Sequence, residues 1–369
     1  MWSFKSLCSA LLISVVMGTT AHAQILIGQT AGFTGAVAAG VKETTDGAKL
    51  YIDSVNAKGG INGQKIELIS LDDKFDPKLA DENARILIEE KNVVAIFLNR
   101  GTPHTQAIIP WLDKHGVPLI APSTGAMVLH QPVQKHVFNV RATYQREAEK
   151  AITHLVTISM TKIAVIYVDD SFGQDGLVGA QKGLTAAGLT PVFLEKIDRA
   201  KPDFTKIVPE IGKSGAQAIM MIASGGFVAD GVKTLRAAGN SAQIVTLSNN
   251  ASGGFIKSLG DNARGVIVSQ VFPNSLNFAL VKEATDMARA KDILEVSPAM
   301  LEGFAAAKVL VEALRRVSGK VTRDKLQAVL DGFGKFDLGG LEISYSPKDH
   351  TGLVFSDLSI ISGAGKFRR

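Results

Sequence analysis

Small hydroxyl residues follow two apolar runs in the first half of the chain, and they are the residues with the clearest chemistry. Thr102 comes after the run at 93–98, and Ser123 and Thr124 come after the run at 117–122. Hydroxyl groups and free backbone N–H groups at helix starts carry partial positive charge and suit a carboxylate. Each residue alone is equally typical of a helix cap or a turn. Together they predict an anion site that uses no cationic side chain.

The second half of the chain supplies further candidates at corresponding positions. Phe172 follows an apolar run and could pack against an apolar solute tail, whereas Tyr144 opens a helical pattern and could add a hydroxyl. Packing in the core explains both aromatic residues equally well. Ser224 and Asn249 follow the next two runs, so the predicted set of binding residues is Thr102, Ser123, Thr124, Tyr144, Phe172, Ser224 and Asn249.

The elements that must position these residues are predicted from hydrophobic patterning. Continuous apolar runs occur at 25–28, 93–98, 163–168, 218–223 and 244–247. Such runs indicate strands buried on both faces, with helices between them, and this alternation is typical of a doubly wound α/β fold. The order of strand, polar loop, helix, glycine and strand occurs twice, about 120 residues apart. We therefore expect two similarly built lobes with a hinge near 139–143.

The first 23 residues have the features of a secretory signal peptide, with an N-terminal anchor as the alternative. Lys5 precedes an apolar stretch, and Ala21-His22-Ala23 resembles a cleavage site. Cys8 is the only cysteine, so the remaining chain must rely on an apolar core and not on disulfides. Its net charge of +4 is scattered along the sequence, which favours a solvated surface over nucleic-acid binding.

Motifs for phosphate, metal and catalysis are weak. The glycines of 28–35 lack the nucleotide-loop spacing and a following GK[ST]. His130 and His136 have no further ligand nearby and are predicted to be solvated. No nucleophile elbow is present, and the adjacent Asp72 and Asp73 should point to opposite faces of a strand. We expect no enzyme activity, no metal and no cofactor.

One stretch carries a specific family resemblance. NAKGGINGQKIELISLDDKFDPKLA, at 56–80, resembles the solute-binding proteins of ABC importers for branched-chain amino acids, which have the type I periplasmic-binding fold. GVPLIAPSTG, YVDDSFGQDG and DFTKIVPEIGKSGAQAIM extend the likeness over nearly the whole chain after the leader. The resemblance implies two lobes that close on a solute and three crossovers near residues 142, 271 and 345–350. The implied division is 1–23 as signal peptide, 24–141 with 272–347 as the first lobe, and 142–271 with 348–369 as the second.

Matched to the family pattern, Thr102, Ser123 and Thr124 occupy the carboxylate-binding positions, and Phe172 is the aromatic residue that closes from the second lobe. Amino-acid binders of this family generally carry an acid in the loop where this chain has 248–250, Ser-Asn-Asn. A desolvated ammonium without an anion is costly. The expected solute is therefore a hydrophobic or aromatic carboxylate without an ammonium group.

Other ligands and roles stay open from the sequence. A small amide or a branched-chain amino acid is the alternative solute, and Asp169, Asp170 and Asp230 are the acids that could reach an ammonium. The resemblance implies a monomeric periplasmic receptor that delivers its solute to an inner-membrane permease with ATPase subunits. A sensor that signals to a regulatory partner and a secreted enzyme of similar fold are the two rival classes.

Overall fold

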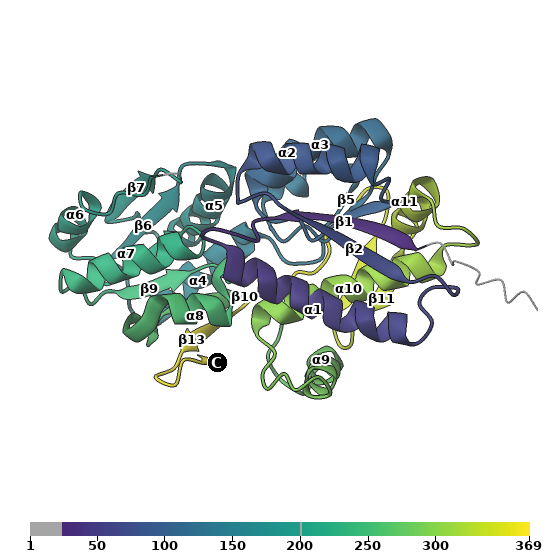
Figure 1. Ribbon diagram of the computed structural model, residues 1–369. Coiled ribbons are helices and arrows are strands. Elements are labelled where there is room, and N and C mark those ends of the chain that lie inside the picture. Colours follow the sequence, from purple (N-terminus) through teal and green to yellow (C-terminus); the bar gives the residue numbers. More distant parts are fainter. Residues whose placement is uncertain (1–23, 200) are drawn as a thin grey trace, which may run out of the picture.

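The computed structural model describes residues 24–199 and 201–369, so the predicted signal peptide lies outside the described residues. The chain forms two α/β lobes side by side, each built on its own sheet (Figure 1). The predicted fold class of two doubly wound α/β lobes is confirmed. Within the described ranges, no helix combines the length and the apolarity needed to cross a membrane.

Lobe 1 contains a five-stranded parallel sheet in the order β2-β1-β3-β4-β5. Its strands are β1 (Ile25–Ala31), β2 (Ile66–Asp72), β3 (Ala95–Phe97), β4 (Leu119–Ile120) and β5 (Val137–Phe138). Its helices are α1 (Ala38–Ala57), α2 (Pro77–Arg85) with the π-helical turn η1 (Ile86–Glu90), α3 (Thr102–His115), the 3₁₀ turn η2 (Met127–Leu129), α9 (Ala279–Arg289), α10 (Pro298–Arg316) and α11 (Arg323–Asp331). A separate hairpin of β11 (Gly334–Asp337) and β12 (Glu342–Tyr345) completes the lobe.

Lobe 2 repeats this strand order and adds two antiparallel strands at one edge. Its sheet runs β7-β6-β8-β9-β10-β13-β14; the β10–β13 and β13–β14 pairs are antiparallel and the other pairs are parallel. The strands are β6 (Ile163–Val168), β7 (Phe193–Ile197), β8 (Ala218–Ile222), β9 (Gln243–Thr246), β10 (Ile267–Gln270), β13 (Asp357–Ile361) and β14 (Phe367–Arg368). The helices are α4 (Tyr144–Thr157), α5 (Ser171–Ala186), α6 (Ile207–Ser214), α7 (Gly226–Ala237) and α8 (Gly253–Leu259), with the 3₁₀ turns η3 (Ser248–Asn250) and η4 (Gly260–Ala263).

Three segments connect the two sheets. They run between β5 and α4, between β10 and α9, and between β12 and β13. The first and third lie side by side, because Asn139 N donates to His350 O at 3.0 Å and Leu353 N donates to Val140 O at 2.9 Å. Two adjacent connections of this kind allow the lobes to rotate about a shared axis. The exact lobe boundaries stay a prediction.

Local signals in the sequence account for most of the first lobe, with one exception. Asp76 and Pro77 have the residue types of a helix cap and a first helical residue, and Asp76 does cap α2, since its Oδ1 accepts from Lys78 N at 2.9 Å. Thr102 and Pro103 have the same pattern, but α3 begins at Thr102 itself, after Gly101 with φ 97°. The Thr102 hydroxyl is therefore free for the contacts described below.

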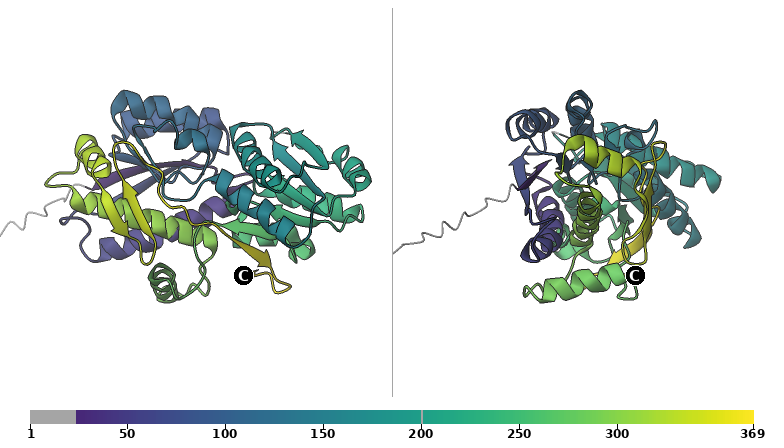
Figure 2. Two further views of the ribbon diagram at one scale, coloured as in Figure 1. Left: turned by 180° about the vertical axis from the view of Figure 1, so that it is seen from behind. Right: turned by 90° about the vertical axis from the view of Figure 1, so that its right-hand side faces the viewer.

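Helices α1 and α10 lie side by side and pack closely against each other (Figure 1, Figure 2). The two helices cross at Gly47 and Gly303, where an added Cβ would lie 1.9 Å from Met300 O and 1.7 Å from Thr44 O, respectively. The atoms in the way belong to the backbone of the other helix, so a methyl group could fit only if a whole helix moved. The crossing therefore requires glycine in both helices.

We expect Gly303→Ala to lower the free energy of unfolding by at least about 2 kcal/mol, because the new methyl group overpacks a helix crossing. Gly212→Ala is the matched control, since Gly212 also lies in a helix but an added Cβ there meets nothing within 4 Å. It should stabilise the protein by about 0.5–1 kcal/mol. Urea unfolding of both variants measures the difference, and equal stabilities would contradict the assigned crossing.

The expectation of solvated histidines is wrong. His130 and His136 are 2% and 5% exposed, and neither ring nitrogen of His130 has a hydrogen-bond partner in the described chain. Burial, with a contribution from the positive charge of Arg141, lowers the pKa of His130 to about 4. The hydrophobic environment therefore keeps this imidazole neutral.

A lowered histidine pKa predicts acid sensitivity. The unfolded chain binds a proton near pH 6.5 and the folded chain only near pH 4, so stability is lost as the pH falls between these values. Between pH 7 and pH 5 this single group should cost about 2 kcal/mol. His130→Phe keeps a ring without a titrating group and should lose less stability over this interval than the wild type. An unchanged pH dependence would contradict a buried neutral His130.

Candidate functional site

The carboxyl ends of strands from both sheets meet between the lobes and surround a cavity of about 260 Å³. Each sheet has the order 2-1-3-4-5 at its core, and ligands of such sheets bind where the strand order reverses. The loops after β1, β3, β8 and β9 supply most of the lining. The lining residues are Gly35, Ala36, Val37, Ala39, Gly40, Arg100, Gly225, Gly226, Asn249, Asn250, Ser252, Gly254, Phe255 and Ser258.

Arg100 is the charged residue of this cavity, and sequence reasoning missed it. Its side chain is 5% exposed and spans the lobes: Nη1 donates to Ser123 Oγ at 3.0 Å, and Nη2 donates to the backbone oxygen of Asn249 at 2.6 Å. Arg100 forms no ion pair with any acid in the described part of the chain. The expectation of an anion site without a cation therefore does not describe this cavity.

Ser123 joins Arg100 to a second residue that the sequence did not reveal. The Ser123 hydroxyl donates to Glu302 Oε1 at 2.7 Å, and Glu302 is only 6% exposed on α10. Since the single proton of Ser123 is directed at Glu302, its lone pair faces the Arg100 guanidinium. This relay fixes the guanidinium and places a negative charge within about 6 Å of it, because the two hydrogen bonds share the Ser123 oxygen and measure 3.0 Å and 2.7 Å.

Removing that negative charge should strengthen anion binding. Glu302→Gln retains an oxygen that can accept from Ser123, so the relay survives while the charge is lost. At an effective dielectric constant near 20, the lost repulsion over 6–8 Å is worth about 2 kcal/mol. Any carboxylate that binds at Arg100 should bind at least tenfold more tightly to this variant, and calorimetry with benzoate as the probe measures the change. Glu312→Gln, on the outer part of the same helix, is the control, and weaker binding to Glu302→Gln would contradict the relay.

Four predicted residues form one packed cluster beside this relay. Thr102 Oγ1 and Thr124 Oγ1 lie 2.7 Å apart, and Thr124 also hydrogen bonds to the Tyr144 hydroxyl. The ring of Tyr144 meets Phe172 edge to face with centroids 4.8 Å apart. Burial raises the pKa of Tyr144, so its hydroxyl keeps its proton. All four side chains are at most 3% exposed and do not line the cavity.

Ser224 and Asn249 meet in lobe 2, and Asn249 is the predicted residue that lines the cavity. Asn249 Nδ2 donates to Ser224 Oγ at 2.9 Å and to Ala223 O at 3.1 Å. Arg100 connects this pair to Ser123, because it donates to both Asn249 O and Ser123 Oγ. Ser123 is in turn the sequence neighbour of Thr124. The structure thus brings all seven predicted residues to one interlobe region.

A buried ion pair links this region to the first connection between the lobes. Arg141, which lies in that connection, pairs with Glu147 on α4 and donates to Ser248 Oγ at 2.6 Å. Glu147 in turn accepts from Ser248 N at 2.9 Å and from the Ser269 hydroxyl. The loop that carries Asn249 is therefore tied directly to the hinge.

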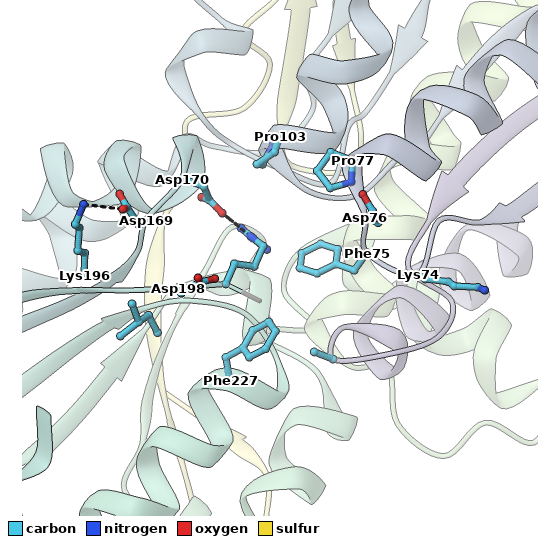
Figure 3. Close-up of a pocket in the computed structure, with 13 residues that line it drawn as sticks. Lys74, Phe75, Asp76, Pro77, Pro103, Asp169, Asp170, Lys196, Asp198 and Phe227 are labelled. Atoms are coloured by element: carbon cyan, nitrogen blue, oxygen red, sulfur yellow. Dashed lines mark hydrogen bonds and ion pairs between the residues drawn. The ribbon is translucent and has the colours of Figure 1, made fainter. Parts of the chain in front are cut away.

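A second, larger cavity of about 840 Å³ opens between the lobes and shares Ala36 with the first. Phe75 of lobe 1 and Phe227 of lobe 2 lie on opposite sides of it (Figure 3). Arg199 crosses the gap, since its guanidinium carbon lies 4.8 Å from the centre of the Phe75 ring. We interpret this cavity as the mouth of the cleft.

Asp169, Asp170 and Asp230 could have paired with the ammonium of a solute, but two of them form ion pairs with other residues and the third is exposed to solvent. Asp169 pairs with Lys196 at 2.7 Å at the cleft mouth, and Asp170 caps α5 and pairs with Arg199 (Figure 3). Asp230 is exposed on α7. None of the three lines the 260 Å³ cavity.

Two lobes with a polar cavity at the facing strand ends define a two-lobed solute receptor. Residues 24–357 match the model of the periplasmic binding protein family, and the chain belongs to that family. An "Amino acid binding protein" of Pseudomonas aeruginosa is 31% identical over 58% of this chain, a match that spans 59% of that relative's length. "Leu/Ile/Val-binding protein homolog 3" of Brucella melitensis is 25% identical over 83% of both chains.

Solved structures agree with this assignment. A substrate-binding periplasmic protein from Ralstonia solanacearum is 30% identical, has a TM-score of 0.85, and matches over 93% of this chain and 99% of its own. The solute-binding protein of an ABC transporter from R. palustris, solved in complex with benzoate, is 18% identical with a TM-score of 0.83 over 94% and 95% of the two chains. At that identity the likeness shows the fold alone. The predicted relationship to branched-chain amino acid receptors is confirmed.

Proposed function

We propose that the protein is the periplasmic receptor of an ABC importer and that it captures a small carboxylate-bearing solute between its lobes. The observation that carries the proposal is Arg100, a buried cation without an ion pair in the described chain, at the wall of the 260 Å³ cavity. A carboxylate binds a guanidinium through two parallel hydrogen bonds and would supply the missing charge. The volume lies below the roughly 300–1,000 Å³ of pockets for drug-sized ligands, which suits a smaller solute.

A hydrophobic or aromatic carboxylate without an ammonium group is the favoured solute. Of the described residues that line the cavity, none is an aspartate or glutamate, so a buried ammonium would meet no opposite charge. A protein with this fold has been solved in complex with benzoate, so the fold can accommodate a carboxylate of this class. The names of the two relatives support a branched-chain or other amino acid as the alternative.

The proposed mechanism is closure of the two lobes around the solute. Arg100, aligned by Ser123, would hold the carboxylate from lobe 1, while Asn249, fixed by its hydrogen bond to Ser224, would complete the site from lobe 2. A solute that contacts both lobes favours the closed arrangement over the open one by its differential affinity. The closed receptor, as a monomer, would then dock on an inner-membrane permease with its ATPase subunits.

Thermal unfolding of solute-free protein, prepared by denaturation and refolding, tests this proposal. A solute at a thousand times its dissociation constant should stabilise the protein by about 4 kcal/mol. We expect a shift with benzoate and none with benzamide, its neutral counterpart. A shift with leucine but with no simple carboxylate would support the amino-acid alternative. Equal shifts with benzoate and benzamide would remove the carboxylate from the proposal.

A further inference from the structure

We propose that the solute carries a neutral hydrogen-bond donor, a hydroxyl or an amide N–H, beside its carboxylate, and that Asn249 Oδ1 accepts from it. The inference rests on the proposed function, because it names a second group on the same solute. It begins from an unsatisfied atom. Asn249 is 7% exposed, and its Oδ1 has no hydrogen-bond partner among the described residues.

The orientation of the Asn249 amide is fixed by its other end. Nδ2 donates to Ala223 O at 3.1 Å and to Ser224 Oγ at 2.9 Å. A flipped amide would place two oxygens against each other at Ala223. Oδ1 is therefore held as a free acceptor, and leaving a buried acceptor unpaired costs free energy that a bound donor would recover.

The neighbouring residue Asn250 provides a comparison, because its side-chain amide is fully hydrogen bonded and has a structural role. Asn250 Oδ1 accepts from Gly225 N at 2.6 Å, and its Nδ2 donates to Ala223 O at 3.0 Å and to Thr246 Oγ1 at 2.8 Å. Every polar atom of that side chain is thus engaged by residues at the ends of β8 and β9. Asn249 differs in its unpaired oxygen.

The residue that carries the unpaired oxygen lines the same cavity as the cation. Asn249 and Arg100 both line the 260 Å³ cavity, and Arg100 Nη2 lies 2.6 Å from the backbone oxygen of Asn249. A carboxylate held by the guanidinium would therefore lie next to Asn249. A donor on the carbon next to the carboxylate is the simplest group that reaches both.

The charge of the surroundings selects a neutral donor. An ammonium would enter beside the Arg100 guanidinium with no acid among the lining residues, and like charges in a desolvated site repel strongly. A hydroxyl or an amide N–H satisfies the same oxygen without adding charge. A 2-hydroxy acid is the smallest solute of this class.

Two series of solutes that differ only in one substituent test the inference by calorimetry. The aliphatic series is 4-methylpentanoate, 2-hydroxy-4-methylpentanoate and leucine, and the aromatic series is phenylacetate, mandelate and phenylglycine. Within each series the substituent beside the carboxylate changes from hydrogen to hydroxyl to ammonium. In at least one series we expect the hydroxy acid to bind roughly tenfold more tightly than the unsubstituted acid, with the amino acid weakest.

Variants at one position assign the effect to Asn249. Asn249→Ala removes the acceptor and should abolish the preference for hydroxyl over hydrogen. Asn249→Asp adds a negative charge and should move the preference to the amino acid by about tenfold or more. Ala223 O keeps the donor from Asn250 in both variants, so the loop retains a hydrogen bond. Asn277→Asp, the same change on an exposed residue, should leave the order of affinities unchanged.

The outcomes separate this inference from the proposed function. Equal affinities for the hydrogen and hydroxyl members in both series, or a hydroxyl preference that survives Asn249→Ala, would overturn the role of Asn249 alone. Failure of every member of both series to bind would overturn the proposed carboxylate receptor itself.

Discussion

Replacing Arg100 with methionine is expected to weaken the binding of a small carboxylate such as benzoate by at least a hundredfold. Arg100 is the cation of the cavity and is aligned by Ser123 and by the backbone of Asn249. Removing one partner of a buried charge pair costs roughly 2–5 kcal/mol. Arg100→Lys keeps the charge but cannot form bidentate hydrogen bonds to a carboxylate, so its affinity for benzoate should lie between those of the wild type and Arg100→Met. Calorimetric titration of refolded, solute-free protein measures all three.

A matched variant separates the site from a general loss of positive charge. Arg146→Met makes the same substitution on the exposed side of α4 and should leave benzoate binding within about twofold of wild type, because surface charges act through water and salt. If Arg100→Met binds benzoate as tightly as Arg146→Met does, Arg100 is not the carboxylate anchor.

Replacing Glu147 with glutamine is expected to lower the free energy of unfolding by about 3–5 kcal/mol, because it leaves the Arg141 guanidinium buried without a carboxylate. Both side chains are at most 1% exposed, and Glu147 also accepts from Ser248 N and from the Ser269 hydroxyl. Burial of Arg141 beside Glu147 makes this the most deeply buried ion pair of the described chain. Urea unfolding monitored by circular dichroism measures the loss.

Two further variants show whether the unpaired charge is the cause. Asp46→Asn breaks an exposed pair with Lys42 and should change stability by less than about 1 kcal/mol. The double replacement Arg141→Met with Glu147→Leu removes both charges and should recover much of the stability lost in Glu147→Gln. A double variant less stable than Glu147→Gln would mean that hydrogen bonding within the network outweighs the charge pairing.

Several strands of both sheets could be predicted because their signals are local. Apolar runs such as 163–168 and 218–223 coincide with β6 and β8 within one residue, since a strand covered on both faces has no polar side to interrupt it. The cap of α2 at Asp76 is equally local, because Asp76 and Pro77 are adjacent residues. Strands β7, β13 and β14 carry no such run, because each of them has exposed or half-buried positions.

The charges of the site could not be predicted because burial of a loop residue is decided by the other lobe. Arg100 stands in a polar loop, where an arginine is usually solvated, and here the loop of Asn249 covers it. Glu302 lies 179 residues from Ser123. The one local signal for Glu302 is that it is an acid within the otherwise apolar start of α10. Acidic residues are rarely buried without a partner. That rule, applied to the sequence, would have singled out Glu302.

The most direct test of the central claim is to let the protein select its own solute. Refolded, solute-free protein and the Arg100→Met variant are incubated with the small-molecule fraction of a bacterial extract, washed and denatured, and the released molecules are identified by mass spectrometry. The account predicts that the wild-type protein enriches a molecule with a carboxylate and that the variant does not. Enrichment of no carboxylate-bearing molecule, or equal enrichment by both proteins, would contradict it.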